Sequence, residues 1–122
     1  MSNELNDPRI LLCPNDTERE AATNFDSFNN DKYVSYFVGV DADQTNPAAI
    51  LAGDRNLEID RKPLAHGMNL VNSKSLIGWT SKIHREQGNF ALADGSVQQS
   101  SGSSLRAQLQ AAGLATNRLV LP

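Results

Sequence analysis

An Asp-Gly pair near the C-terminus, Asp94-Gly95, constrains the fold of this chain more than any other feature. It separates Asn89–Ala93 from Ser96–Gln99, two short stretches with apolar side chains. Asp-Gly favours a two-residue type I′ turn, because both central residues of that turn need a positive φ. The pattern therefore predicts a β-hairpin over residues 89–99.

The two-residue loop also predicts the register of this hairpin. Leu92 pairs with Val97, and Phe90 then lies on the same face as both of them. One face of the hairpin is apolar and suited to a core, whereas Ala91 and Gln98 lie on the other face.

Other apolar stretches predict the remaining strands. Arg9–Cys13 lies between two prolines, and Tyr33–Val40 is rich in aromatic and β-branched residues, which favours a central strand. Ala49–Asp54 predicts a further strand, Asn56–Asp60 an edge segment, and Leu119–Leu121 a closing strand or an apolar tail.

One helix is predicted, over Ser104–Gly113. Leu105, Leu109 and Ala112 follow helical spacing, Ser103 or Ser104 is the expected N-cap, and Gly113 lies beyond the end. Between the strands and this helix, 61–78 is predicted to be a long irregular crossing anchored by Trp79, and 100–104 a loop.

We therefore expect one domain over residues 1–122, of the α+β class. Its four or five short strands form a small antiparallel sheet with the C-terminal Asp-Gly hairpin, and a short C-terminal helix packs against it. A parallel sheet is not expected, since the segments between strands lack helical periodicity.

Charge and hydropathy exclude two classes of partner. The chain has 11 Lys and Arg against 14 Asp and Glu, a net charge of −3, which does not suit a nucleic-acid-binding surface. Its apolar runs, such as Ala48–Ala52 and Ile10–Cys13, are much shorter than the roughly 20 residues of a membrane-spanning helix. We therefore expect this chain to be soluble and to have no membrane-spanning segment.

Asp41 and Asp43 follow a predicted strand in an Asp-x-Asp-x-Thr arrangement that resembles the first motif of haloacid-dehalogenase-like phosphatases. In that family the first Asp attacks phosphate and the second acts as acid and base, with Mg²⁺ present. The motif is short, and Gly53-Asp54 and Asp60 are not spaced as the family's later acidic pair. A solvated turn is the favoured interpretation.

Calcium is a second alternative for the same loop. An EF-hand is excluded, because Asn46 and Ala52 stand where its Gly and Glu are required. A non-standard Ca²⁺ site remains open, with Asp41, Asp43 and Asp54 as candidate ligands; otherwise no cofactor is expected.

Cys13 offers a third alternative, a nucleophilic triad with His66 or His84 and an acidic partner such as Asp94. A thiol inside an apolar run is usually an inert small hydrophobic group, so the sequence does not favour this arrangement.

A more specific pattern runs from His84 to Asp94, with nine residues between them, and contains Gly88 and Asn89. Gly88 lets the chain turn into the hairpin, and Asp94-Gly95 turns it back. His84 then lies beyond the open end of the hairpin, where it is predicted to pin that end to a loop by hydrogen bonding.

This His-x(9)-Asp-Gly pattern resembles the prepilin-type processing-associated domain of pilin-like proteins. Three further blocks resemble the same group, so that the similarity spans nearly the whole chain: Pro8–Thr17, Ser35–Gly39 and Leu51–Asn56.

The resemblance implies a type II secretion pseudopilin-like or type IV pilin-like subunit. Such proteins carry a cleaved leader and a long apolar N-terminal helix, neither of which occurs in this sequence, so we expect it to correspond to the head. We predict a non-catalytic structural protein whose partners are other pilin-like subunits, periplasmic or at the cell surface when part of a full-length protein.

Overall fold

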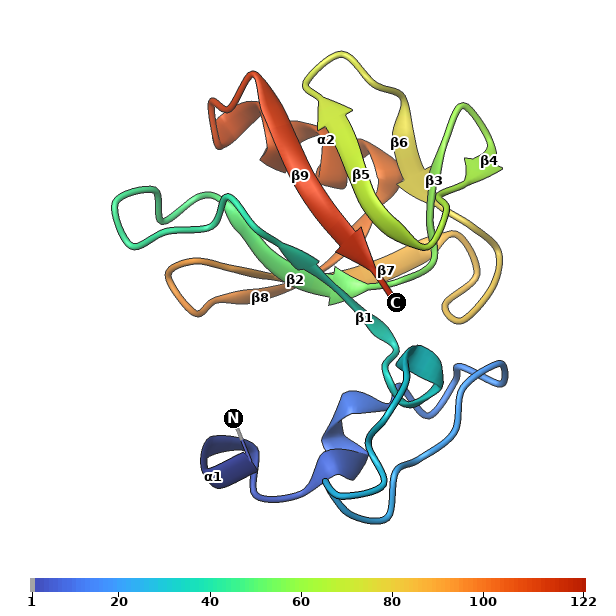
Figure 1. Ribbon diagram of the computed structural model, residues 1–122. Coiled ribbons are helices and arrows are strands. Elements are labelled where there is room, and N and C mark those ends of the chain that lie inside the picture. Colours follow the sequence, from blue (N-terminus) through green and yellow to red (C-terminus); the bar gives the residue numbers. More distant parts are fainter. Residues whose placement is uncertain (1) are drawn as a thin grey trace.

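The Asp-Gly hairpin forms one edge of a six-stranded antiparallel sheet with the order β5-β9-β1-β2-β7-β8 (Figure 1). A second antiparallel sheet has three strands in the order β4-β3-β6. The structure, a computed structural model, describes residues 2–122 and confirms the α+β class. It shows more strands than the four or five predicted, and two sheets in place of one.

The elements in chain order are α1 Ser2–Leu5, η1 Pro8–Leu11, η2 Asp31–Tyr33, β1 Tyr36–Gly39, β2 Ile50–Asp54, β3 Leu57–Ile59, β4 Lys62–Pro63, β5 Gly67–Asn72, β6 Ile77–Trp79, β7 Gln87–Leu92, β8 Val97–Ser101, α2 Gly102–Ala111 and β9 Thr116–Leu121. None of the helices within residues 2–122 is long and apolar enough to cross a membrane.

The hairpin is present, but its predicted register is wrong by one residue. Ala91, not Leu92, pairs with Val97, and the Leu92 amide donates to the Ser96 carbonyl at 2.9 Å. Only Gly95 of the Asp-Gly pair has a positive φ, at 87°, so the loop is a three-residue turn and not type I′. Val97 consequently lies on the face opposite Phe90 and is 70% exposed.

Gly95→Ala is expected to lower the free energy of unfolding by more than about 1 kcal/mol, because an L-residue is strained in the left-handed region. Apart from Gly95 and its two chain neighbours, no residue has an atom within 4 Å of the position a Cβ would take, so the cost is backbone strain and not a clash. Urea denaturation measures the change. Gly95→Asn is the control: Asn tolerates this conformation, and an equal loss in both variants would contradict the explanation.

The core lies between the inner face of the six-stranded sheet, the three-stranded sheet and α2. Leu105 and Leu109 of α2 are buried as predicted, and Trp79 anchors β6 at 2% exposure. The helix begins two residues earlier than predicted, since Ser101 is its N-cap and accepts from the Ser104 amide. The predicted loop at 100–104 is therefore the end of β8 and the start of α2.

Two predicted strands, Tyr33–Val40 and Ala49–Asp54, are confirmed in shorter form as β1 and β2, which pair with each other inside the larger sheet. The closing strand at Leu119–Leu121 is also confirmed as part of β9, which pairs with β1 and β5.

The prediction for Arg9–Cys13 is wrong. Pro8 begins a 3-10 helix whose N-cap, Asp7, accepts from the Arg9 amide, and Ile10 is exposed. A proline at the first helical position after an Asp cap favours a helix start, and this local signal outweighs the short apolar run.

Two further predictions for the middle of the chain are corrected. Asn56–Asp60 was expected at an edge, but β3 is the central strand of the second sheet. Residues 61–78 are not irregular, because they contain β4, β5 and the start of β6. In β5 the apolar Met68 and Leu70 point outward and are exposed, so its sequence lacks the usual alternation of a half-buried strand.

Candidate functional site

His84 lies on the loop between β6 and β7, three residues before β7 begins. Its neighbours Ile83, Arg85 and Glu86 all have positive φ, at 62°, 53° and 65°. Left-handed backbone is unfavourable for such residues, above all for β-branched Ile83. Strain of this kind persists only where surrounding contacts hold it in place.

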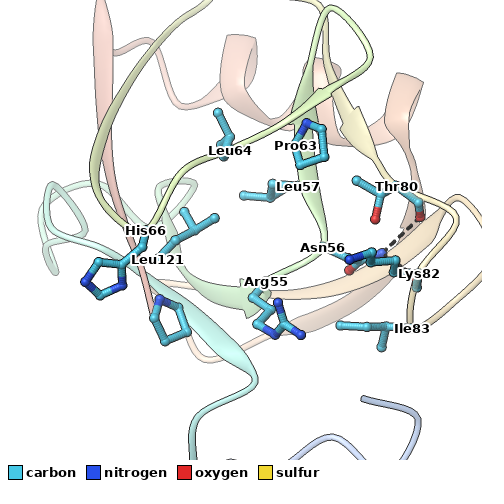
Figure 2. A pocket seen from close by; sticks show the side chains of 11 residues that line it. Arg55, Asn56, Leu57, Pro63, Leu64, His66, Thr80, Lys82, Ile83 and Leu121 are labelled. Atoms are coloured by element: carbon cyan, nitrogen blue, oxygen red, sulfur yellow. Dashed lines mark hydrogen bonds between the residues drawn. The ribbon is translucent and has the colours of Figure 1, made fainter. Parts of the chain in front are cut away.

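Asn56 supplies those contacts. It is buried, and its side-chain Nδ2 donates to the carbonyls of Thr80, Lys82 and Gln87 at 3.2, 3.0 and 3.1 Å. Figure 2 shows Asn56 against the loop, with its bond to Thr80 drawn. One amide therefore holds both ends of the loop that presents His84.

The imidazole of His84 meets two side chains from distant parts of the sequence, Cys13 and Asp54. Its Nε2 lies 3.4 Å from Sγ of Cys13 and 3.3 Å from Oδ2 of Asp54. Cys13 and Asp54 are 5% and 1% exposed, and the His84 side chain is 19% exposed. We call Cys13, Asp54 and His84 the Cys-His-Asp cluster.

Asp54 also connects the cluster to the hairpin. Its Oδ2 accepts from the backbone amide of Asn89 at 2.6 Å and from the Asn89 side chain at 3.0 Å. Two residues of the predicted motif, His84 and Asn89, thus converge on one carboxylate that was a calcium candidate. Gly88, which directly precedes Asn89 in the motif, packs on the Trp79 ring.

The same region attaches the N-terminal segment, residues 2–34, which lies beneath the sheet beside the start of β1 (Figure 1). Arg55 donates to both oxygens of buried Asp16, at 2.6 and 2.7 Å, and to Glu18 at 2.8 Å. Glu18 also pairs with Lys82 of the His84 loop. His84 therefore faces the N-terminal segment. These contacts support the prediction that His84 ties the open end of the hairpin to a loop, but they do not test it.

The Cys-His-Asp cluster differs from a nucleophilic triad. In a triad the acid binds the imidazole nitrogen that does not face the nucleophile, whereas here Nε2 faces both Cys13 and Asp54. Burial, together with the charges of Asp54 and Asp16, raises the pKa of the Cys13 thiol. Asp94, the predicted acidic partner, lies in the hairpin turn and binds Ser96.

Cys13 is accordingly expected to react slowly with iodoacetamide at neutral pH. A buried thiol with a raised pKa has little thiolate and little access to the reagent. We expect alkylation at least about tenfold slower in the native chain than in the same chain unfolded in urea. Mass spectrometry measures both rates, and similar rates would contradict the burial of this thiol.

The other candidate ligands do not come together. Asp41 binds Arg118 at 2.6 to 2.8 Å, and Asp43 binds Thr45 beside it. Asp54 lies with His84 and Asn89 instead. The antiparallel sheet also lacks the parallel arrangement that the phosphatase motif requires. Neither the calcium nor the phosphatase alternative gains support from these positions.

The cavities near the β6–β7 loop are either small or widely open to solvent. A cavity of about 80 Å³ lies beside Arg55, Leu64 and Ile83 (Figure 2), well below the roughly 300 Å³ of a small-molecule site. A shallow groove runs between β6 and the start of α2, where Glu58, Arg61 and Arg106 mix charges of both signs.

The comparisons with known proteins do not identify a family. No family model, no curated protein and no solved structure matches the chain. The function is therefore inferred from the residues and their arrangement.

Proposed function

We propose that this chain is a non-catalytic structural or assembly subunit, similar to the globular head of a type II secretion pseudopilin or a type IV pilin. Its partners are other pilin-like subunits, at the periplasmic side or the cell surface. The His-x(9)-Asp-Gly pattern suggests this class, and one feature of the sheet supports it.

That feature is a row of apolar side chains across the outer face of the six-stranded sheet. One residue from each strand lies in direct register with the next: Met68, Val120, Val38, Ala52, Ala91 and Val97, in the order β5 to β8. Met68, Val38 and Val97 are 54%, 50% and 70% exposed. We call these six residues the apolar row.

The position of the apolar row favours a contact surface. The opposite face already packs on α2 and the second sheet, so the row is not needed for the core of this chain. Contiguous apolar surface of this kind marks an interaction site more often than chance exposure. A hollow of about 130 Å³ beside Ala52, Ala91 and Val97 offers a recess for a side chain of a neighbouring subunit.

Photo-crosslinking in the native host tests the proposal. A photoreactive amino acid at Val38 is expected to yield adducts with pilin-like subunits, identified by mass spectrometry. The matched control is Leu76, which is 64% exposed but lies in the loop between β5 and β6. Adducts only with unrelated proteins, equal adducts from both positions, or none from Val38 would each refute the proposed assembly role.

A further inference from the structure

We propose that the Cys-His-Asp cluster binds one divalent transition-metal ion of the zinc class and thereby fastens the N-terminal segment to the sheet. The ligands would be Sγ of Cys13, Nε2 of His84 and a carboxylate oxygen of Asp54. They come from the N-terminal segment, the β6–β7 loop and β2. This inference does not depend on the proposed function.

Two of the three pairs of ligand atoms are already spaced as such an ion requires. All three lie within 4.8 Å of one another. Around a tetrahedral zinc ion, bond lengths of about 2.0 Å to nitrogen or oxygen and about 2.3 Å to sulfur give ligand separations of roughly 3.3 to 3.6 Å. The Nε2–Oδ2 and Nε2–Sγ distances are 3.3 and 3.4 Å, so neither pair has to move far.

The chemistry of the three ligands selects the class of metal. Thiolate and imidazole suit zinc and its transition-metal neighbours, whereas Ca²⁺ takes oxygen ligands. A thiolate and a carboxylate together carry two negative charges, which a divalent cation neutralises in this buried position. As the metal–sulfur bond forms, the thiol proton leaves to solvent, and no electron is transferred.

Neighbouring side chains contact two of the ligands, Asp54 and His84, and orient them. Both Asn89 hydrogen bonds hold the Asp54 carboxylate in place. On the other side of the imidazole, the Asn15 amide lies 3.5 Å from Nδ1 of His84. A half-turn of this amide would present its oxygen to Nδ1–H and leave Nε2 free for the metal. Such outer partners are usual around metal-binding histidines.

Under this proposal, the strained β6–β7 loop places His84 in the position that metal binding requires. Three left-handed residues and the Asn56 clamp bring His84 to Cys13 and Asp54 before any ion arrives. The partly exposed imidazole leaves one side open, where a water molecule would complete four-fold coordination.

Cobalt titration of the reduced full chain tests the site. Co²⁺ is expected to saturate at one equivalent with a thiolate-to-cobalt charge-transfer band in the near-ultraviolet. Zn²⁺ should displace it, and Ca²⁺ in excess should not. Zn²⁺ should also raise the melting temperature in proportion to the logarithm of its free concentration above Kd, because it binds the native state.

Variants decide which residues bind. Cys13→Ser should abolish the charge-transfer band, and His84→Gln should weaken Co²⁺ binding by at least about tenfold. His66→Gln is the control, because His66 is exposed and pairs with Asp31. Circular dichroism verifies that each variant is folded.

Three results would overturn the proposal: no charge-transfer band in the wild-type chain, unchanged Co²⁺ binding in folded Cys13→Ser, or equal weakening in His66→Gln. None of these affects the crosslinking result at Val38, so failure of the metal site and failure of the assembly role are distinguishable.

Discussion

Asp16→Asn is expected to lower the free energy of unfolding by about 3 kcal/mol at pH 7, because it leaves the half-buried Arg55 guanidinium without its main partner. Asp16 is buried and accepts two Arg55 hydrogen bonds at 2.6 and 2.7 Å. Asparagine keeps the shape but removes the charge and one acceptor. Glu18 still binds Arg55, which keeps the loss at the lower end of the range for a broken buried pair.

The same pair predicts how stability depends on pH. Burial alone would raise the pKa of Asp16, but the Arg55 hydrogen bonds and charge outweigh it and hold the pKa below its usual 3.8. The unfolded chain therefore binds this proton more readily than the folded one. The contribution of Asp16 is complete above about pH 5 and is lost as the pH falls through the native pKa.

Urea denaturation between neutral and acidic pH measures both effects. The wild-type chain should lose stability toward low pH more steeply than Asp16→Asn. Asp41→Asn is the matched control, since Asp41 also pairs with an arginine, Arg118, but at an exposed site. Its loss should be much smaller. An equal loss in the two variants at pH 7 would show that burial of the Asp16 pair adds nothing.

Gly88→Ala is expected to destabilise the chain by about 3 kcal/mol, the upper end of the usual cost of overpacking. A Cβ at this position would lie 2.5 Å from the Trp79 ring. Trp79 is 2% exposed, and its Nε1 donates to Ser100 at 3.2 Å, so the indole has little room to move. Strand β7, which carries Asn89, must shift instead.

Thermal and urea denaturation measure this loss, and Gly78→Ala is the control. Gly78 is also a strand glycine, but a Cβ there makes only ordinary contacts, the nearest at 3.7 Å from the Glu58 carboxylate. A Gly88→Ala chain as stable as Gly78→Ala would mean that the Trp79 contact is not tight. In that case Gly88 would have no packing role in the motif.

Much of the framework could be predicted from local patterns. The Asp-Gly turn, the aromatic and β-branched strand β1 and the amphipathic helix α2 each carry their own signal. The hairpin register could not be predicted from the pair alone, because Asp-Gly serves both two-residue and three-residue loops. The outcome depended on whether Asp94 took a positive φ, and it did not.

The sequence offered His84 as one of two possible partners of Cys13, but it did not indicate Asp54 as the acidic residue beside them. Cys13, Asp54 and His84 lie far apart in the chain, and only the long-range packing of the N-terminal segment brings them together. Asp54 was a candidate calcium ligand at the end of a predicted strand, yet it is buried beside His84 and Asn89. The closest sequence signal was Arg55-Asn56, two polar residues directly after a buried strand, whose partners the sequence does not indicate.

The attachment of the N-terminal segment has a mechanical consequence. A pulling force applied near the start of the chain would reach the Cys13 and Asp16 contacts before it reached β1, which is hydrogen-bonded on both sides. These contacts would rupture first and lengthen the tether while the sheet stayed intact. Single-molecule stretching should then show a small extension at low force, before the main unfolding peak of the sheet.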